Sequence, residues 1–322
     1  MARLTTLTDE DIRVLAGRFG LGEVIEWKPI AAGTINSNFA LRCASGRFFL
    51  RINEGKSEAD VAYEAKLVNQ LAENEVPTPR PLRAGERSYA EHGGKWVSAF
   101  PWVAGHHLER NEITPAVAAM IGGALGQLHD AGDAVRDLPE RYGIYTFEAL
   151  VERAMSFADH DDSQLANANR AIAEEIAWLG GQPESQSPGI IHGDLFRDNV
   201  LFVGRTDGDE LELSALLDFE QASLGQRVYD LAVCVNAWCY DEAFDPVLVR
   251  SMVRGYQGHR GAPLTSELYR ELRRAAWRFT VTRITDVYLA GGRDPAKDFR
   301  RYLQRLSAWR RLGESGLESW LA

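Results

Sequence analysis

Short alternations of apolar and polar residues fill the N-terminal part of the chain, and this pattern is typical of β-strands. They predict strands at residues 26–30, 38–43, 48–52 and 95–100, with one more shortly before the last. Two segments, at residues 9–19 and 57–73, instead repeat apolar residues with helical spacing. The first helix is expected to begin at a capping box formed by Thr8 and Asp11. The sequence therefore predicts a strand-rich N-terminal part with two helices.

Beyond Pro101 the apolar spacing becomes mainly helical. Thr114 and Pro115 supply a cap and a first-position proline for one of these helices. We interpret His129 as the end of that helix, where the helix dipole favours a cation. A strand-like island at residues 189–219 interrupts the helical pattern.

The change in pattern divides the chain into two lobes. Its 322 residues are enough for two closely packed parts. We predict an α+β fold, with a β-rich N-terminal lobe at residues 1–102 and a mainly helical C-terminal lobe at residues 103–322.

Composition excludes several classes of protein. The formal net charge is −10, and an acidic chain is not expected to bind nucleic acid. No uninterrupted apolar run reaches about 18 residues, so no membrane span is expected. Acidic residues 9–11 interrupt the place where a signal peptide needs an apolar region. The three cysteines fit no zinc-site spacing, and we expect reduced thiols in a cytoplasmic protein. They are Cys43, Cys234 and Cys239.

Candidate chemistry is concentrated in the strand-like island. In residues 190–202, apolar runs flank a polar centre that contains Asp194 and, five residues later, Asn199. A second apolar run ends at Asp218. A helix is expected to begin soon afterwards, with Asp230 near its start bonding to loop backbone.

These three side chains fit the needs of phosphoryl transfer, which depends on positioning and charge neutralisation. Asp194 suits the base that accepts the proton of an attacking hydroxyl. Asn199 and Asp218 supply the hard oxygen ligands that Mg²⁺ prefers. Each residue alone is also explained as a turn or capping residue. Their order and their positions beside buried strands favour the kinase interpretation.

A kinase also needs a cation for the phosphates of ATP. Arg51 lies on the third predicted strand, at a position suited to this role. Glu64 falls within the apolar stripe of the following helix, where an unpaired charge is costly. The alternative is that Glu64 reaches water at the edge of the stripe. We predict instead that Glu64 pairs with Arg51.

The remaining nucleotide contacts are predicted from loops. The small-residue loop between the first two strands contains Gly33, Thr34 and Ser37, and its backbone N–H groups are expected to cover the phosphates. A single glycine makes this a weak signal. The adenine is expected beside Phe100 and Val103, where the two lobes join.

With these residues in view, the chain resembles the aminoglycoside phosphotransferase / choline kinase superfamily of protein-kinase-like enzymes over nearly its whole length. His192-Gly193-Asp194 with Asn199 is similar to the catalytic loop of that superfamily, and Asp218 to its metal-binding aspartate. Phe196-Arg197-Asp198 inside the loop is most similar to the homoserine kinases of the kinase-fold type. The chain departs from the superfamily pattern at Arg51, where a lysine is usual.

The resemblance implies a protein-kinase-like fold and an ATP- and Mg²⁺-dependent transfer to the hydroxyl of a small amino-acid or amine-like acceptor, with homoserine favoured. For such an acceptor, Arg197 or Arg283 is expected to bind the carboxylate. The ammonium is expected at an acid near Glu220 or Asp241, or at an amide such as Asn36. A choline- or ethanolamine-type kinase, an aminoglycoside kinase and a non-catalytic nucleotide-binding module remain alternatives. We expect a monomer or homodimer whose partners are ATP and the acceptor.

Overall fold

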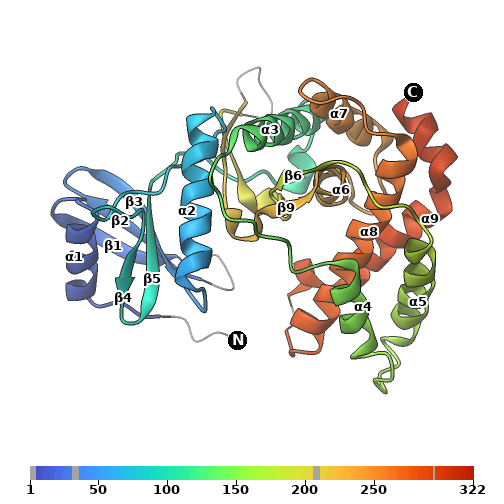
Figure 1. The fold of residues 1–322 in the computed structure, drawn as a ribbon, viewed down its shortest axis with the longest axis horizontal. Helices are drawn as coiled ribbons and strands as arrows, with labels where there is room; N and C mark the ends of the chain where they lie inside the picture. Colours follow the sequence, from blue (N-terminus) through green and yellow to red (C-terminus); the bar gives the residue numbers. More distant parts are fainter. Residues whose placement is uncertain (1–4, 31–35, 206–210, 293) are drawn as a thin grey trace. The chain divides into compact units, whose positions relative to one another are not determined.

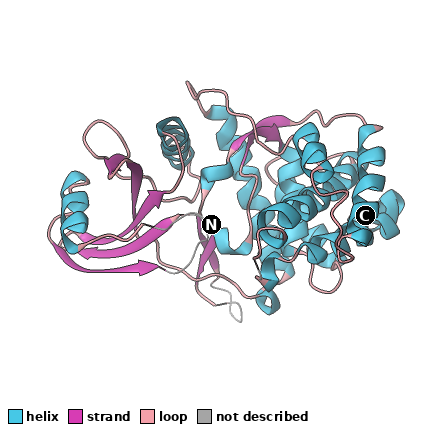
Figure 2. Cartoon of the chain, turned by 90° about the horizontal axis from the view of Figure 1, so that it is seen from below, coloured by secondary structure: helices cyan, strands magenta, loops and turns pink. Residues whose placement is uncertain are grey.

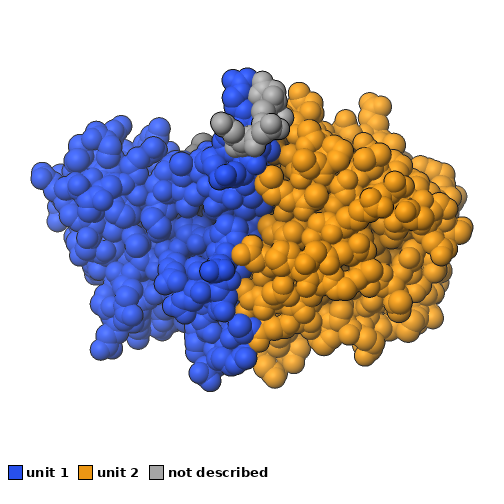
Figure 3. Space-filling model, turned by 90° about the horizontal axis from the view of Figure 1, so that it is seen from above, with its two compact units in different colours: residues 1–107, 134–139, 200–220 blue, residues 108–133, 140–199, 221–322 orange. Residues whose placement is uncertain are grey.

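A computed structural model gives the structure of the protein. It describes residues 5–30, 36–205, 211–292 and 294–322. The chain forms two compact units, which Figure 3 distinguishes by colour. The first unit contains residues 1–107, 134–139 and 200–220, and the second contains residues 108–133, 140–199 and 221–322. The predicted lobe boundary between residues 102 and 103 stays a prediction.

The first unit is built on a five-stranded antiparallel sheet with the strand order β1-β2-β3-β5-β4 (Figures 1 and 2). The strands are β1 (Val24–Ile30), β2 (Ser37–Cys43), β3 (Gly46–Asn53), β4 (Ala90–His92) and β5 (Lys95–Pro101). Adjacent residues of a strand point to opposite faces of the sheet. Leu50 and Ile52 of β3 are buried in an apolar cluster, whereas Arg51 between them pairs with a helix residue and is absent from that cluster.

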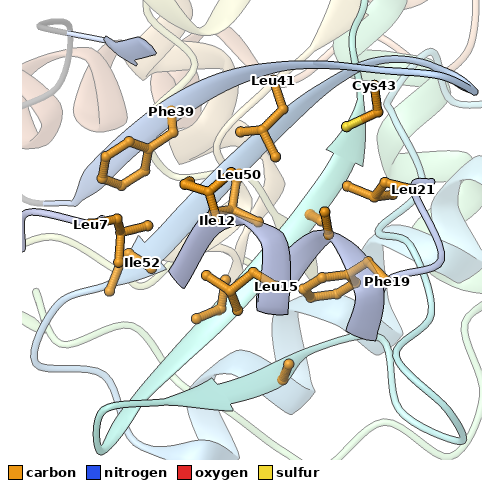
Figure 4. Close-up of a cluster of buried hydrophobic side chains, with 14 residues drawn as sticks. Leu7, Ile12, Leu15, Phe19, Leu21, Phe39, Leu41, Cys43, Leu50 and Ile52 are labelled. Carbon is orange, nitrogen blue, oxygen red and sulfur yellow. The ribbon is translucent and has the colours of Figure 1, made fainter. Parts of the chain in front are cut away.

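Helix α1 (Asp9–Arg18) packs on the sheet and contributes residues to the apolar cluster. Its capping box is formed by Thr8 and Asp11, as the sequence predicts. Figure 4 shows Ile12 and Leu15 of this helix packed among side chains from the sheet. Both residues are fully buried, so this amphipathic helix removes one face of the sheet from water.

Helix α2 (Glu58–Glu73) begins at Ser57, which forms a second capping box with Asp60. The helix packs against β5 and buries an apolar stripe that includes Leu67 and Leu71. A hairpin of β7 (Val200–Val203) and β8 (Glu212–Leu216) also belongs to the first unit. Leu216 N donates to Pro77 O at 2.6 Å, which ties this hairpin to the chain that follows α2.

The second unit is mainly helical (Figure 2). Its helices are α3 (Pro115–Ala134), α4 (Phe147–Met155), α5 (Ala166–Gly180), α6 (Arg227–Trp238), α7 (Pro246–Gln257), α8 (Thr265–Arg283) and α9 (Phe299–Leu321). A small antiparallel pair, β6 (Pro188–Ile191) and β9 (Ser223–Gln226), lies in the same unit. Short 3-10 segments occur at Arg110–Glu112, Arg197–Asn199, Phe219–Gln221 and Pro295–Lys297, and a π-helical turn at Ile284–Tyr288.

Two glycines allow helices α3 and α7 to approach each other closely. A Cβ atom on Gly122 would lie 2.0 Å from Met252 O, and one on Gly255 would lie 2.0 Å from Ala119 O. Only glycine fits such backbone contacts, so these positions fix how the two helices pack.

The observed elements confirm the predicted α+β fold. One helix boundary was predicted wrongly, because α3 continues past His129 to Ala134 and the imidazole is fully buried. Among the helices of the described residues, none is both long and apolar enough to cross a bilayer.

Candidate active site

The loop after β6 carries Asp194 and Asn199 in the second unit. Gly193 adopts φ +77°, a left-handed conformation that favours glycine and turns the chain directly before Asp194. Asn199 Nδ2 donates to Asp194 O at 2.8 Å. The amide nitrogen is thereby used, so Oδ1 is the side-chain atom of Asn199 that suits a metal ion. The structure therefore brings these two predicted residues together in one loop.

Asp230 of α6 holds this loop by its backbone. Its Oδ2 accepts from His192 N at 2.7 Å, and its Oδ1 accepts from Gly193 N at 2.8 Å. Asp230 bonds to loop backbone as predicted, but the loop that it holds is the one carrying Asp194 and not the one after Asp218. Trp238 adds a second anchor, because its indole Nε1 donates to Leu195 O at 2.9 Å.

A buried histidine completes the support of Asp230. His129 Nε2 lies 3.1 Å from Asp230 Oδ2, and His129 Nδ1 lies 2.9 Å from Tyr256 Oη. Burial lowers the pKa of His129. A neutral imidazole with its proton on Nε2 satisfies both contacts, with the tyrosine donating to Nδ1. Burial alone would raise the pKa of Asp230, but hydrogen bonds from His129 and the loop backbone lower it, so the carboxylate stays charged.

Asp218 follows β8 in the first unit, with φ +62°. A non-glycine residue in this conformation is uncommon, and such residues cluster at functional sites. Its side chain is 42% exposed, and Oδ1 lies 3.6 Å from Arg51 Nη1. An accessible carboxylate held in this way fits the role of a Mg²⁺ ligand.

Arg51 also pairs with Glu64 of α2, with 2.6 Å between Nη2 and Oε2. Both side chains are more than nine-tenths buried. Burial alone would lower the pKa of Arg51, but the nearby carboxylates of Glu64 and Asp218 outweigh it and raise the pKa. The predicted Arg51–Glu64 pair is confirmed, while its contact with ATP phosphates stays a prediction. Phe100 of β5 lies beside the guanidinium, 5.7 Å from ring centroid to Cζ.

The other predicted residues of the first unit form a polar network. Asn36 uses both ends of its amide, since Oδ1 accepts from Glu54 N at 3.1 Å and Nδ2 donates to Glu220 Oε2 at 3.0 Å. Lys56 Nζ lies 3.7 Å from the same Glu220 oxygen. Ser37 Oγ donates to Glu54 Oε1 at 2.7 Å. The structure thus brings Asn36 and Glu220 together, and their predicted contact with an acceptor stays a prediction.

Five further residues were predicted to contact the nucleotide or the acceptor. Gly33 and Thr34 lie outside the described residues. Val103 and Arg197 are half-buried, and Arg197 lies in the 3-10 turn that ends at Asn199. Arg283, also half-buried, donates from Nη1 to Ala296 O at 3.1 Å. Their predicted roles stay predictions.

One residue beside the catalytic loop was missed by the sequence analysis. Arg278 of α8 places Nη1 3.7 Å from Asp194 Oδ1. Its position in a long helix rich in arginine gave no signal that distinguishes it from surface charges. Its neighbours Trp277 and Phe279 are apolar, but adjacent residues of a helix point in different directions and so do not define a buried face.

The loop with Asp194 and Asn199 fits a small-molecule kinase, and comparisons with known proteins establish this class. Residues 26–277 match the phosphotransferase enzyme family, so the chain belongs to that family. Homoserine kinase of Chelativorans sp. (strain BNC1) is 32% identical over 99% of each chain. Homoserine kinase of Nitrobacter winogradskyi is 31% identical, over 97% of this chain and 96% of that protein.

A solved structure supports the fold independently. Spectinomycin phosphotransferase, in complex with ADP and spectinomycin, aligns with a TM-score of 0.67 over 98% of each chain. The sequence identity is 16%, so this likeness establishes the kinase-like fold and nothing more specific. The predicted resemblance to the superfamily is confirmed.

Proposed function

We propose that this protein transfers the γ-phosphate of ATP to the hydroxyl of homoserine. The observation that carries the proposal is the loop with Asp194 and Asn199, hydrogen-bonded to Asp230, in a chain that matches homoserine kinases over almost its full length. Phosphoryl transfer requires little beyond positioned groups and neutralised charge, which this loop is built to supply.

In this proposal each residue has one task. Asp194 orients the acceptor hydroxyl and takes its proton as the new O–P bond forms. Asn199 Oδ1 and the Asp218 carboxylate would hold Mg²⁺, which would neutralise phosphate charge. Arg51, kept in place by Glu64, binds the non-transferred phosphates. The adenine is expected beside Phe100 and Val103, and the backbone of the loop containing Gly33 and Thr34 is expected over the phosphates.

The proposal includes the cellular compartment and the binding partners of the protein. Each of the three cysteines is a buried free thiol, which fits a reducing compartment such as the cytoplasm. ATP and one small acceptor are the expected partners.

An acceptor screen tests the proposed function. ADP release should be measured with ATP and Mg²⁺ against homoserine, choline, ethanolamine and an aminoglycoside, with Asp194→Asn as the matched control. We expect homoserine to give the highest kcat/KM and the variant to lose turnover with every acceptor. Greater activity with choline or the aminoglycoside would overturn the acceptor assignment. ATP binding without turnover on any acceptor would support a non-catalytic module instead.

A further inference from the structure

Arg278 is a buried cation whose hydrogen-bonding capacity is not met. The residue is 4% exposed, and neither Nε nor Nη1 has a hydrogen-bond partner among the described residues. Other buried arginines of the same helix are satisfied better. Arg273, for example, donates from Nε and Nη2 to the two carboxylate oxygens of Glu175, at 2.9 and 2.7 Å. Because leaving buried charged donors unpaired is costly, Arg278 indicates a missing acceptor group.

Aromatic rings hold the guanidinium in place. Its Cζ lies 4.1 Å from the ring centroid of Tyr145 and 3.8 Å from that of Phe279. These contacts stabilise the cation without supplying hydrogen-bond acceptors. Burial alone would lower the pKa of Arg278, but the nearby Tyr229 and Asp194 raise it, so the side chain remains charged.

The unpaired donors lie next to the proposed base. Nη1 is 3.7 Å from Asp194 Oδ1, which is beyond the usual range of a hydrogen bond. Tyr302 of α9 provides a second buried group without a partner, its Oη. Its ring centroid lies 4.8 Å from that of Phe279, and it interacts electrostatically with both Asp194 and Arg278. Two nitrogens of Arg278 and the hydroxyl of Tyr302 therefore lack hydrogen-bond partners among the described residues, and both side chains interact electrostatically with Asp194.

We propose that Arg278 binds the carboxylate of the acceptor and thereby selects hydroxy amino acids over amino alcohols. A carboxylate supplies both the negative charge and the acceptor oxygens that this guanidinium lacks. A cationic acceptor such as choline or an aminoglycoside would instead meet like charge beside Asp194. The inference rests on the proposed function and assigns to Arg278 the role that the sequence suggested for Arg197 or Arg283.

The role of the acceptor carboxylate can be tested on the unmodified enzyme by comparing acceptors with and without that group. Homoserine, its carboxamide and 3-aminopropan-1-ol share the same hydroxyl and amine, but only homoserine carries the carboxylate. For the unmodified enzyme we expect kcat/KM to fall roughly 10- to 100-fold for the two analogues, as loss of a charged hydrogen bond predicts. This arm needs no variant and therefore cannot fail through misfolding.

Variants then test whether Arg278 causes the preference for an acceptor with a carboxylate. In Arg278→Met the homoserine-to-aminopropanol ratio of kcat/KM should collapse to within about threefold, mainly through a raised KM for homoserine. Arg278→Lys should restore part of the ratio, because it keeps the charge. Arg274→Met is the matched control on the same helix. The Arg274 side chain is more exposed than that of Arg278, and its Nη1 lies 3.9 Å from Glu271 Oε2. This variant should leave the ratio unchanged.

The possible outcomes distinguish a failure of the role given to Arg278 from a failure of the proposed function. If Arg278→Met lowers kcat equally for homoserine and aminopropanol, Arg278 acts on the transferred phosphoryl group or on Asp194, and the inference is wrong. If the unmodified enzyme prefers the amide or the amino alcohol, the inference is also wrong. If the unmodified enzyme phosphorylates none of the three compounds, the proposed function itself fails.

Discussion

Arg51 and Glu64 form a buried ion pair between strand β3 and helix α2, with 2.6 Å between Nη2 and Oε2. Leu50 and Ile52 point into the apolar cluster. Because adjacent strand residues point to opposite faces, Arg51 between them points toward helix α2 instead. The pair therefore couples packing of the sheet to the placement of a cation that we assign to the ATP phosphates.

Removing the charge of Glu64 should weaken ATP binding. In Glu64→Gln we expect the KM for ATP to rise roughly 10-fold or more, because Arg51 loses its strongest positioning partner. Steady-state kinetics with ATP as the varied substrate check this. Glu58→Gln is the control on the same helix, since Glu58 pairs with Arg87 at the surface, where ion pairs contribute little. An unchanged KM in Glu64→Gln would contradict the role given to the pair.

Asp218→Asn should raise the magnesium requirement without unfolding the protein. Asparagine tolerates the positive φ of this position, so the backbone is expected to be kept while the negative charge is lost. We expect the Mg²⁺ concentration for half-maximal activity to rise roughly 10-fold, with an unchanged Tm. A magnesium titration of activity measures this. The same magnesium dependence in both proteins would remove Asp218 from the metal site.

The close approach of α3 and α7 predicts a pair of opposite stability effects. Gly122→Ala places a methyl group 2.0 Å from Met252 O and should lower the free energy of unfolding by about 2 kcal/mol or more. In Gly123→Ala on the same helix, the added methyl group would lie 3.8 Å from Gly255 O, so the change should be neutral or stabilising, by up to about 1 kcal/mol. Urea unfolding of both variants decides the point. A stable Gly122→Ala protein would show that the helix contact is not tight.

Glu54 should make stability depend on acidic pH. Burial alone would raise its pKa, but hydrogen bonds from Lys95, Thr5 and Ser37 lower it to about 2, from 4.5 in the unfolded chain. Because the folded pKa is the lower one, the stabilisation is present above about pH 4.5 and is lost as pH falls toward 2. The shift corresponds to about 3 kcal/mol.

The test is the acid limb of the stability profile. Glu54→Gln should flatten the loss of unfolding free energy between pH 4.5 and pH 2, relative to the unmodified protein. Glu91→Gln, an exposed glutamate in β4, is the control and should leave the slope unchanged. Equal slopes for all three proteins would contradict the assignment of a low pKa to Glu54.

Local signals in the sequence were enough for much of the fold. The capping boxes at Thr8 and Ser57 mark helix starts by short-range hydrogen bonds, which depend on residues three apart. Glu64 was recognisable because a charge within an apolar stripe needs a partner, and a charged residue on the preceding strand was available. The spacing of Asp194 and Asn199 likewise reflects a single loop.

Long-range contacts set the limit of prediction. His129 was placed at a helix end because nothing in its neighbourhood shows that Asp230, about a hundred residues later, provides a buried partner. Arg278 is 84 residues from Asp194 along the sequence and lies among several arginines of α8. Only the packing of the second unit distinguishes it from them.

The most direct test of the account is a single-turnover measurement with ATP, Mg²⁺ and homoserine, comparing the unmodified protein with Asp194→Asn. We expect the unmodified protein to form O-phosphohomoserine and the variant to form it at least roughly 100-fold more slowly, with an ATP Kd changed by less than about threefold. Near-normal transfer by the variant, or no phosphohomoserine from either protein, would contradict the account.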